Sequence, residues 1–378
     1  LFHLVIHAGN TAIYRLNVCH TKQTTNTPPL QHALFIDATS RISLCSMRRS
    51  RKMLVRIISV VAVACLIVVG TSAYNFYHYR RPGDNPRDPA TITAKSDVEP
   101  VSGDYLRGFY YPAHGDTHPG TVVVFSGSDG GNNDNMARQI RDGGYNVLGL
   151  YFFGQPGQQQ YLSDVPLEFF DEVLAWIKEH GDVQAPITVL GLSKGAELVA
   201  NLAIRYPEIN NIVLYAPAAY NYQGLNFRQR NALPSFTWRR EPVDYARLPF
   251  FPSTTVRLFM NLPVSYRKTY EVSLAEASNR DSARIPIEKF SGHGLLFAGD
   301  QDAMWQSDSA VQELSERNKN LEGVIYPGAG HLFSRDIDQE YGRIWPTMLG
   351  GTVDGNRAAK IQSDKLLFER LDAWHMDT

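Results

Sequence analysis

The chain has no cysteine beyond Cys65, and this absence removes several kinds of chemistry from most of its length. Its 378 residues contain three cysteines, Cys19, Cys45 and Cys65. Disulfide bonds, a cysteine-ligated zinc ion and a cysteine nucleophile are therefore excluded for everything that follows residue 65.

An excess of charge of either sign is also missing. Lysine and arginine number 37 against 38 aspartates and glutamates, which gives a formal net charge of -1. A nucleic-acid surface or a strongly acidic partner is therefore not expected. Hydrophobic residues make up 43% of the chain and charged residues 20%, which is ordinary globular composition with enough apolar material for one large core.

The N-terminal segment has the pattern of an export signal. Residues 1–46 show no sustained period, and we interpret them as an over-extended start without structure. The stretch that follows, residues 47–79, is basic from Met47 to Arg56 and apolar from Ile57 to Gly70, and small residues follow up to Ala73. This order predicts export, with the basic cluster in the cytoplasm and the rest of the chain outside it.

Two fates of residues 47–79 agree with the sequence. The 14-residue apolar run fits a signal-peptide core and is short for a bilayer span, which favours cleavage after Ala73. No charged residue occurs from Ile57 to Tyr79, and four aromatic residues follow the run as in an interfacial belt, which favours an uncleaved membrane anchor.

The remaining chain is expected to form a linker and one domain. Residues 80–103 are rich in proline, glycine and small polar residues and predict a linker. From residue 104 to 378, strand-like segments at 106–113, 121–127, 145–152 and 187–192 alternate with helix-like segments at 136–144, 166–181 and 193–207. This alternation predicts a mostly parallel sheet with helices on both faces.

The least regular part of the domain lies at about 220–284, where aromatic residues and arginines are interleaved. We interpret it as a lid-like insertion that covers an acyl pocket. The alternative is a surface loop that packs its own aromatic side chains on the domain.

A nucleophile motif stands at the junction of the fourth strand with the helix that follows it. Gly191 to Gly195 read GLSKG, the G-x-S-x-G pattern of a strained strand-to-helix turn whose flanking positions have no room for side chains. Such a turn aims Ser193 out of the sheet, and the backbone N–H of Lys194 can stabilise an oxyanion there. A Gly-Ser turn that only caps a helix is the alternative.

Serine needs a base, and in this fold the acid and then the histidine follow it along the chain. An apolar strand from His293 runs into Asp300 and Asp302; we expect Asp302 to orient the base, with Asp300 as the second choice and a turn-forming role as the alternative for either. His331 lies on a glycine-rich loop after the last strand and is expected to be the general base. His180 and His293 are expected to be structural.

The second oxyanion donor is expected from the loop after the second strand, because that loop faces the nucleophile across the sheet. This loop reads SGSDGGNN, Ser126 to Asn133, and Ser128 is assigned as the donor with Asp129 as the alternative. A phosphate-binding role is discounted, since the loop lacks both the G-K-[ST] ending of a P-loop and the spacing of a dinucleotide fingerprint.

Four stretches together resemble the catalytic domain of a known family, the acyl-CoA thioesterases and bile acid-CoA:amino acid N-acyltransferases, whose nucleophile motif reads G-x-[SC]-K-G-[AG]-E. They contain GLSKGAE, FAGDQDAMW, YPGAGH and the terminal GGTVDGNRAAK. The resemblance implies an α/β-hydrolase fold and a triad of Ser193, Asp302 and His331. Serine at position 193 is similar to the thioesterase branch, because the amino-acid-conjugating members typically carry cysteine there.

The sequence therefore predicts a serine hydrolase that cleaves an acyl ester or thioester through an acyl-enzyme, without a metal or organic cofactor. Animal members of the family carry an immunoglobulin-like N-terminal domain, for which only a linker and a strand or two are present here. An exported domain would not normally meet acyl-CoA, so a simple ester, an amide or another activated acyl group is expected. An acyltransferase to an amine and a catalytically inactive envelope binding module are the alternatives.

Overall fold

The computed structural model describes residues 33–83, 87–90, 97–115, 117–180, 186–226, 228–229 and 231–376. Two compact units are present, Leu1–Ile67 and Val68–Thr378. The second unit contains the sheet and all of the residues predicted to be functional.

The N-terminal segment is one long helix, α1 (Ala33–His78). No proline or glycine occurs between residues 33 and 69, so nothing in the sequence interrupts the helix before Gly70. The helix begins earlier than the predicted segment 47–79, and residues 33–46, which we expected to lack structure, belong to it. Residues 1–32 lie outside the described residues. The part from Arg49 to His78 is long and apolar enough to cross a membrane, by length and composition.

Eight strands form the main sheet, in the order β1-β2-β4-β3-β6-β7-β10-β11. Only β2 runs antiparallel to its neighbours; the other pairings from β4 to β11 are parallel. This order and direction define an α/β-hydrolase fold, as the sequence predicted. The strands are β1 (Glu99–Ser102), β2 (Arg107–Tyr111), β3 (Thr121–Phe125), β4 (Asn146–Tyr151), β6 (Ile187–Leu192), β7 (Asn211–Tyr215), β10 (His293–Gly299) and β11 (Leu321–Tyr326).

The sheet begins within the segment that we predicted to be a linker. β1 pairs with β2 from Glu99 opposite Tyr110 to Ser102 opposite Arg107, so the folded domain starts before residue 104. Composition did not reveal this edge strand, because only Val101 of its four residues is buried and it contains a proline.

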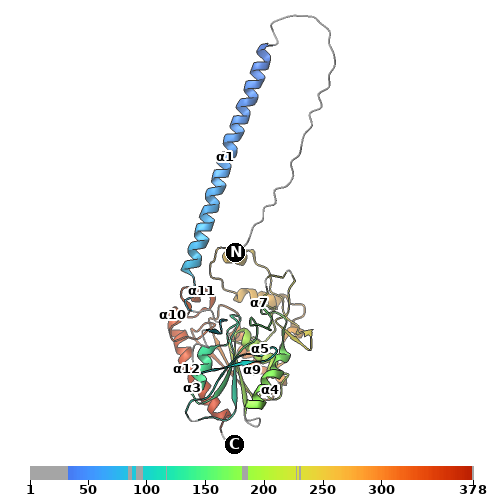
Figure 1. Ribbon diagram of the computed structural model, residues 1–378, viewed down its shortest axis with the longest axis vertical. Helices are drawn as coiled ribbons and strands as arrows, with labels where there is room; N and C mark the ends of the chain where they lie inside the picture. The colour runs from blue at the N-terminus through green and yellow to red at the C-terminus, as the bar shows by residue number, and fades with distance from the viewer. Residues whose placement is uncertain are drawn as a thin grey trace. The chain divides into compact units, whose positions relative to one another are not determined.

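Helices cover both faces of the sheet (Figure 1): α3 (Asp134–Asp142) and α12 (Val353–Trp374) on one face, and α4 (Phe170–His180), α5 (Lys194–Ala203) and α9 (Ser307–Arg317) on the other. Successive residues of a strand point to opposite faces, so each strand supplies both layers. In β3, for example, Val123 and Phe125 pack with the α5 side, whereas Val122 and Val124 pack with the α12 side.

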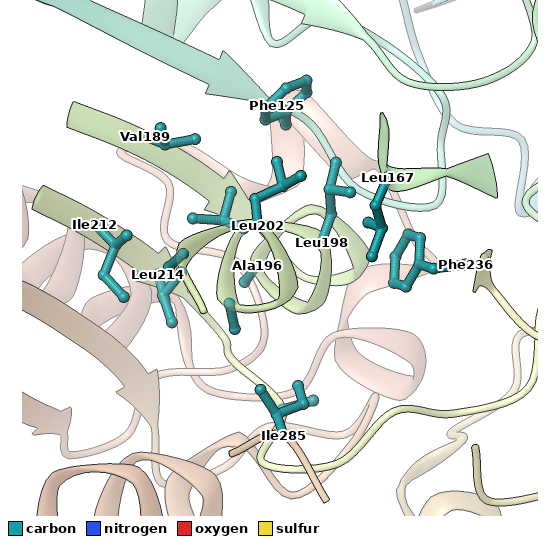
Figure 2. Close-up of a cluster of buried hydrophobic side chains, with 14 of the residues drawn as sticks. Phe125, Leu167, Val189, Ala196, Leu198, Leu202, Ile212, Leu214, Phe236 and Ile285 are labelled. Carbon is teal, nitrogen blue, oxygen red and sulfur yellow. The ribbon is translucent and has the colours of Figure 1, made fainter. Parts of the chain in front are cut away.

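The core on the α5 side joins the strands, α5 and the insertion. Figure 2 shows α5 side chains packed between strand residues and residues from the periphery: Ala196, Leu198 and Leu202 of α5, with Phe125, Val189, Ile212, Leu214, Leu167, Phe236 and Ile285. Burying one such aliphatic or aromatic side chain contributes about 1.5–3 kcal/mol. This packing fixes the position of the first turn of α5, where the predicted nucleophile lies.

The helix predicted at 166–181 begins four residues later than expected. Leu167–Phe169 form a 3-10 turn, η1, after the extended Pro166, and α4 starts at Phe170. The fully buried positions of α4 are Phe170, Val173 and Ile177, while Leu174 is half-buried. The helical period of the pattern is confirmed, but Val173 rather than Leu174 lies on the fully buried face of the helix.

The insertion at 220–284 is divided between packed and exposed parts. Its first half contributes β8 (Phe236–Trp238) and β9 (Glu241–Pro242) to a small sheet with β5 (Val165–Pro166), which lies outside the insertion. Tyr220, Tyr222 and Phe236 are buried. Its second half holds α6 (Pro252–Phe259), α7 (Arg267–Glu276) and α8 (Arg280–Ala283), and α6 has no buried residue. The remaining short helices are η2 (Ile287–Lys289), α10 (Ile337–Tyr341) and α11 (Trp345–Met348).

Candidate active site

Ser193 occupies a strained turn between β6 and α5. Its backbone has φ 56° and ψ -119°, a conformation that costs free energy for any residue with a side chain and occurs mostly at functional sites. The turn also explains the flanking glycines. A Cβ atom on Gly191 would overlap the carbonyl of Gly195, and one on Gly195 would overlap the carbonyl of Ser126.

The backbone of Ser193 is held from the neighbouring strand, since its N–H donates to the Tyr215 carbonyl at the end of β7 (2.9 Å). Its side-chain oxygen makes no hydrogen bond within the part of the chain that the structure describes, and the residue keeps 9% of its surface exposed. The hydroxyl is therefore available for a substrate or for a base on the opposite loop.

Asp302 and His331, which are 29 residues apart, form a buried hydrogen bond. His331 Nδ1 lies 2.8 Å from Asp302 Oδ2. The exposed fraction is 3% for His331 and 1% for Asp302. The carboxylate also accepts from Ser307 Oγ (2.5 Å) and from the backbone N–H groups of Met304 (2.8 Å) and Trp305 (3.2 Å). These donors fix the carboxylate, and the carboxylate favours the His331 tautomer that carries its proton on Nδ1 and leaves Nε2 free to accept one.

Asp300, the second choice for the acid, lies elsewhere. Its Oδ1 accepts from the Gly328 backbone N–H (2.7 Å), and the residue is exposed. Asp300 thus closes the turn between β10 and the histidine loop, the role that an aspartate commonly has after a strand.

The terminal glycine turn is hydrogen bonded to the histidine loop. Gly350 and Gly351 both have positive φ, and the Leu349 carbonyl that precedes them accepts from the His331 N–H (2.7 Å). The buried Asn356 side chain accepts from the Gly330 N–H (2.9 Å). The resemblance at this C-terminal stretch therefore has a physical basis, because the turn and the start of α12 position the histidine.

Trp305 connects the acid–histidine pair to the end of β7, the strand whose Tyr215 carbonyl accepts the Ser193 N–H. Its ring lies against the His331 ring, with 5.8 Å between centroids, and its Nε1 donates to the Ala216 carbonyl (3.2 Å). Ala216 directly follows Tyr215, the acceptor for the Ser193 N–H. Because all three predicted triad residues follow parallel strands, they lie at the same carboxyl edge of the sheet.

The loop predicted to complete the oxyanion site passes beside Ser193. A Cβ atom on Gly127 would lie 3.2 Å from the Ser193 Cβ atom, so the backbone at Gly127 and Ser128 runs alongside the nucleophile. The Asp129 carboxylate is used within the loop, where it accepts from Ser126 Oγ (2.8 Å) and the Gly131 N–H (3.3 Å). The backbone N–H of Ser128 stays the candidate donor opposite that of Lys194, with the backbone N–H of Asp129 as the alternative.

Sequence reasoning missed the role of the Lys194 side chain. Its Nζ atom is buried under the turn, 2.7 Å from Glu197 Oε2 and 2.9 Å from Ser235 Oγ, and Glu197 Oε1 accepts from the Tyr222 N–H (3.1 Å). Burial lowers the pKa of Lys194 and raises that of Glu197, and their mutual attraction opposes both shifts. The available signal was a lysine three residues before a glutamate in an otherwise apolar helix.

The second missed contact comes from the predicted linker. Arg87 donates through Nε to the Asp129 carbonyl (2.6 Å) and through Nη2 to the Ser128 carbonyl (3.5 Å). A segment expected to be a linker thus contacts the candidate oxyanion loop. Nothing in its composition indicated this, because a single arginine in a proline-rich stretch has no periodic partner.

The other candidates have ordinary surroundings. His180 is stacked on Trp176 at the end of α4, and His293 is exposed at the first residue of β10. Among the described residues, no group of three or more histidines, cysteines, aspartates or glutamates is arranged to hold a metal ion.

Comparisons with known proteins show which families this chain is similar to. Residues 165–335 match the family model described as BAAT / acyl-CoA thioester hydrolase C terminal. An acyl-coenzyme A thioesterase 6 of Mus musculus is 30% identical over 68% of this chain and 57% of its own length. A bile acid-CoA:amino acid N-acyltransferase of Mus musculus is 28% identical over 61% of this chain and 53% of its own length.

An esterase of Pyrococcus furiosus is similar in structure, with a TM-score of 0.45 and 15% identity over 78% of this chain and 99% of that one. The chain spans about half the length of the curated relatives it matches. Ser193, Asp302 and His331 all fall inside the matched residues 165–335. Residues 165–335 of the chain are thus similar to the BAAT / acyl-CoA thioester hydrolase C-terminal family, and they belong to a domain whose strand order is that of an α/β-hydrolase fold.

Proposed function

We propose that the protein is a serine hydrolase that cleaves an acyl ester or thioester through an acyl-enzyme. The observation that carries this proposal is the buried hydrogen bond between Asp302 and His331 (2.8 Å) at the sheet edge where Ser193 stands on its strained turn. Ser193 Oγ attacks the acyl carbonyl, His331 Nε2 takes its proton, and Asp302 stabilises the resulting imidazolium.

The first step leaves a negative charge on the former carbonyl oxygen. The backbone N–H groups of Lys194 and Ser128 donate to this oxygen, and the N-terminal end of α5 adds the favourable end of its dipole. His331 then protonates the leaving group, which departs as an alcohol or thiol. Water, activated by the same imidazole, attacks the acyl-enzyme and releases the acid.

A fluorophosphonate probe tests the nucleophile without knowledge of the substrate. Ser193 should become labelled, and Ser193→Ala should abolish labelling, while Ser291→Ala, a surface serine at the other edge of the sheet, should leave it intact. Removal of the nucleophile should lower turnover about 10⁶-fold. Labelling that persists in Ser193→Ala, or no labelling of the parent chain, would refute the proposal in favour of a binding module.

A pair of isosteric variants tests the acid. Asp302→Asn should lower turnover about 10⁴-fold, because the amide no longer holds the reactive histidine tautomer. Asp300→Asn keeps an oxygen that can accept from the Gly328 N–H and should retain most activity. Equal losses in the two variants would contradict the assignment.

Transfer to an amine is the second candidate, because N-acyltransferases are among the relatives. It uses the same acyl-enzyme, and only the final acceptor differs. Esters and acyl-CoA thioesters of graded chain length, incubated with and without amino acids, separate the two outcomes by product. Free acid as the main product in both cases supports hydrolysis, which serine at position 193 favours.

We also propose that α1 anchors the domain in a membrane with residues 80–378 outside the cytoplasm. The apolar run up to Gly70, the basic residues before it and the length of the helix support this. Protease added to sealed inside-out and right-side-out vesicles, followed by the mass of the protected fragment, reports the orientation and whether Ala73 is a cleavage point. Digestion of the catalytic domain from the cytoplasmic side would refute the proposal.

A further inference from the structure

The second half of the insertion presents an unusually apolar surface. α6 (Pro252–Phe259) has no buried residue, and large apolar side chains are exposed on it and at Phe250, two residues before it. Their exposed fractions are 75% for Phe250, 61% for Val256, 50% for Leu258 and 69% for Phe259. Exposed apolar clusters of this kind are costly in water and mark surfaces that meet a partner or a membrane.

The last turns of α1 lie beside this helix, within the same compact unit. Ser72 Oγ donates to the Phe259 carbonyl (3.1 Å), and Asn75 Nδ2 donates to the Met260 carbonyl (2.8 Å). Asn261 Nδ2 donates back to Ser72 Oγ (2.9 Å). Asn75 is buried by this contact, although its neighbours in the helix are not.

The contacting turns of α1 also carry exposed aromatic side chains. Tyr74, Phe76 and Tyr77 are 62%, 52% and 74% exposed, and aromatic residues of this type are typical of the membrane–water interface. We define the α6 surface as these three residues together with Phe250, Val256, Leu258 and Phe259. It begins four residues after Gly70, the end of the apolar run.

Basic residues border the α6 surface. Arg80 and Arg81 are exposed, and Arg81 lies over the Tyr341 ring (4.5 Å to its centroid). Arg343 Nη1 contacts His78 Nδ1 (2.8 Å) at the end of α1. An apolar centre with arginines at its edge is complementary to a bilayer whose headgroups are anionic.

We infer that the α6 surface inserts into the lipid bilayer next to the anchor, and that the active site takes its acyl substrate from that bilayer. The occupant is thus a phospholipid membrane, and the substrate class is an amphiphile held in it. The part that concerns the substrate rests on the proposed function; the insertion itself does not.

Side-chain hydrogen bonds connect the segment after α6 to the loop of the candidate acid. Six residues after Phe259, Ser265 Oγ donates to the Ala303 carbonyl (2.7 Å), and Arg267 Nη1 donates to the Asp302 carbonyl (3.1 Å). The segment that follows α6 therefore lies against the loop that holds the acid. A substrate that leaves the membrane at α6 would therefore begin next to the segment that contacts the acid loop.

Spin labels test the insertion without any enzymatic activity. In a full-length chain with Cys19, Cys45 and Cys65 replaced by serine, a nitroxide at Phe259→Cys is compared with one at Met376→Cys. Met376 is 65% exposed and adjoins His375, which contacts Thr188 at the start of β6, so it lies at the opposite edge of the sheet. Both proteins are reconstituted into vesicles of phosphatidylcholine and phosphatidylglycerol.

The label at position 259 should be accessible to oxygen and protected from a water-soluble nickel complex, and the label at 376 should show the reverse. Equal, water-like accessibility at both positions would overturn the inference. Dipolar broadening at position 259 that disappears on dilution with unlabelled chain would overturn it in favour of a second copy as the occupant.

A second measurement tests the substrate part. The combined variant Val256→Ser, Leu258→Ser, Phe259→Ser should hydrolyse a water-soluble short-chain ester at the parent rate and a vesicle-embedded long-chain ester about tenfold more slowly. Equal losses on both substrates would contradict delivery from the bilayer. If the parent chain hydrolyses neither ester, the proposed function fails, while the spin-label result stands by itself.

Discussion

α5 and α6 are two short helices rich in apolar residues, and their surroundings are opposite. Every residue of α5 is buried, between the sheet and the first half of the insertion, whereas α6 has no buried residue. Apolar composition therefore does not identify what a helix packs against. The described residues bury α5, whereas they leave the side chains of α6 exposed.

The polar residues of the two helices differ in the same way. α5 buries a lysine and a glutamate completely, which is tolerable only because each is paired and hydrogen bonded. The charge on α6, Arg257, is exposed and donates to the Pro263 carbonyl (2.7 Å). Substitutions in α5 should therefore change the free energy of unfolding, and substitutions in α6 should change association of the protein with the bilayer.

The largest effect on stability is expected at the buried ion pair. Lys194→Met leaves the Glu197 carboxylate buried without its partner and should lower the free energy of unfolding by about 3–5 kcal/mol. Urea denaturation followed by circular dichroism measures it. The double variant Lys194→Met, Glu197→Leu should be more stable than the single variant; additive losses would contradict the coupling of the pair.

The next effect concerns packing in α5. Leu198 is fully buried, so Leu198→Ala removes apolar contacts and leaves a cavity, and it should cost about 2–5 kcal/mol. The same denaturation experiment applies. A loss below about 1 kcal/mol would mean that α5 is not packed as the structure has it.

A smaller, pH-dependent effect is expected where the strand leading to α5 begins. His375 is fully buried, with Nε2 2.8 Å from Thr188 Oγ1 in β6, and burial lowers its pKa. A depressed histidine pKa contributes stability that is present above the unfolded value of about 6.5 and is lost as the pH falls below it. The free energy of unfolding should therefore decrease between pH 7.5 and pH 5.5, and less so in His375→Gln.

The smallest effect is expected in α6, for the same chemical change that is costly in α5. Leu258 is 50% exposed, so Leu258→Ala should alter the free energy of unfolding by no more than about 0.5 kcal/mol in detergent-free buffer. Thermal denaturation of the two leucine variants side by side gives the contrast. A loss at Leu258 equal to that at Leu198 would show that the protein itself covers α6.

Local patterns were enough to predict the elements around the nucleophile. β6, the turn at Ser193 and α5 follow from an apolar run, two glycines and a helical period that are contiguous in the sequence. The choice of Asp302 over Asp300 rested on spacing alone, and the contact of Asp302 with His331 and of Asp300 with Gly328 depends on how two loops meet. The start of the sheet at β1 was hidden by its proline.

The sequence by itself determined the strand and helix on either side of the nucleophile, the strained turn between them and the residue types able to act as nucleophile, acid and base, because these depend on neighbours along the chain. Only the tertiary structure decided that Lys194 pairs with Glu197 beneath that turn, that Arg87 contacts the Ser128 loop, and that the described residues leave α6 exposed. Each of these depends on segments far apart in sequence, and the free energy of such contacts is set by burial, which no local pattern records.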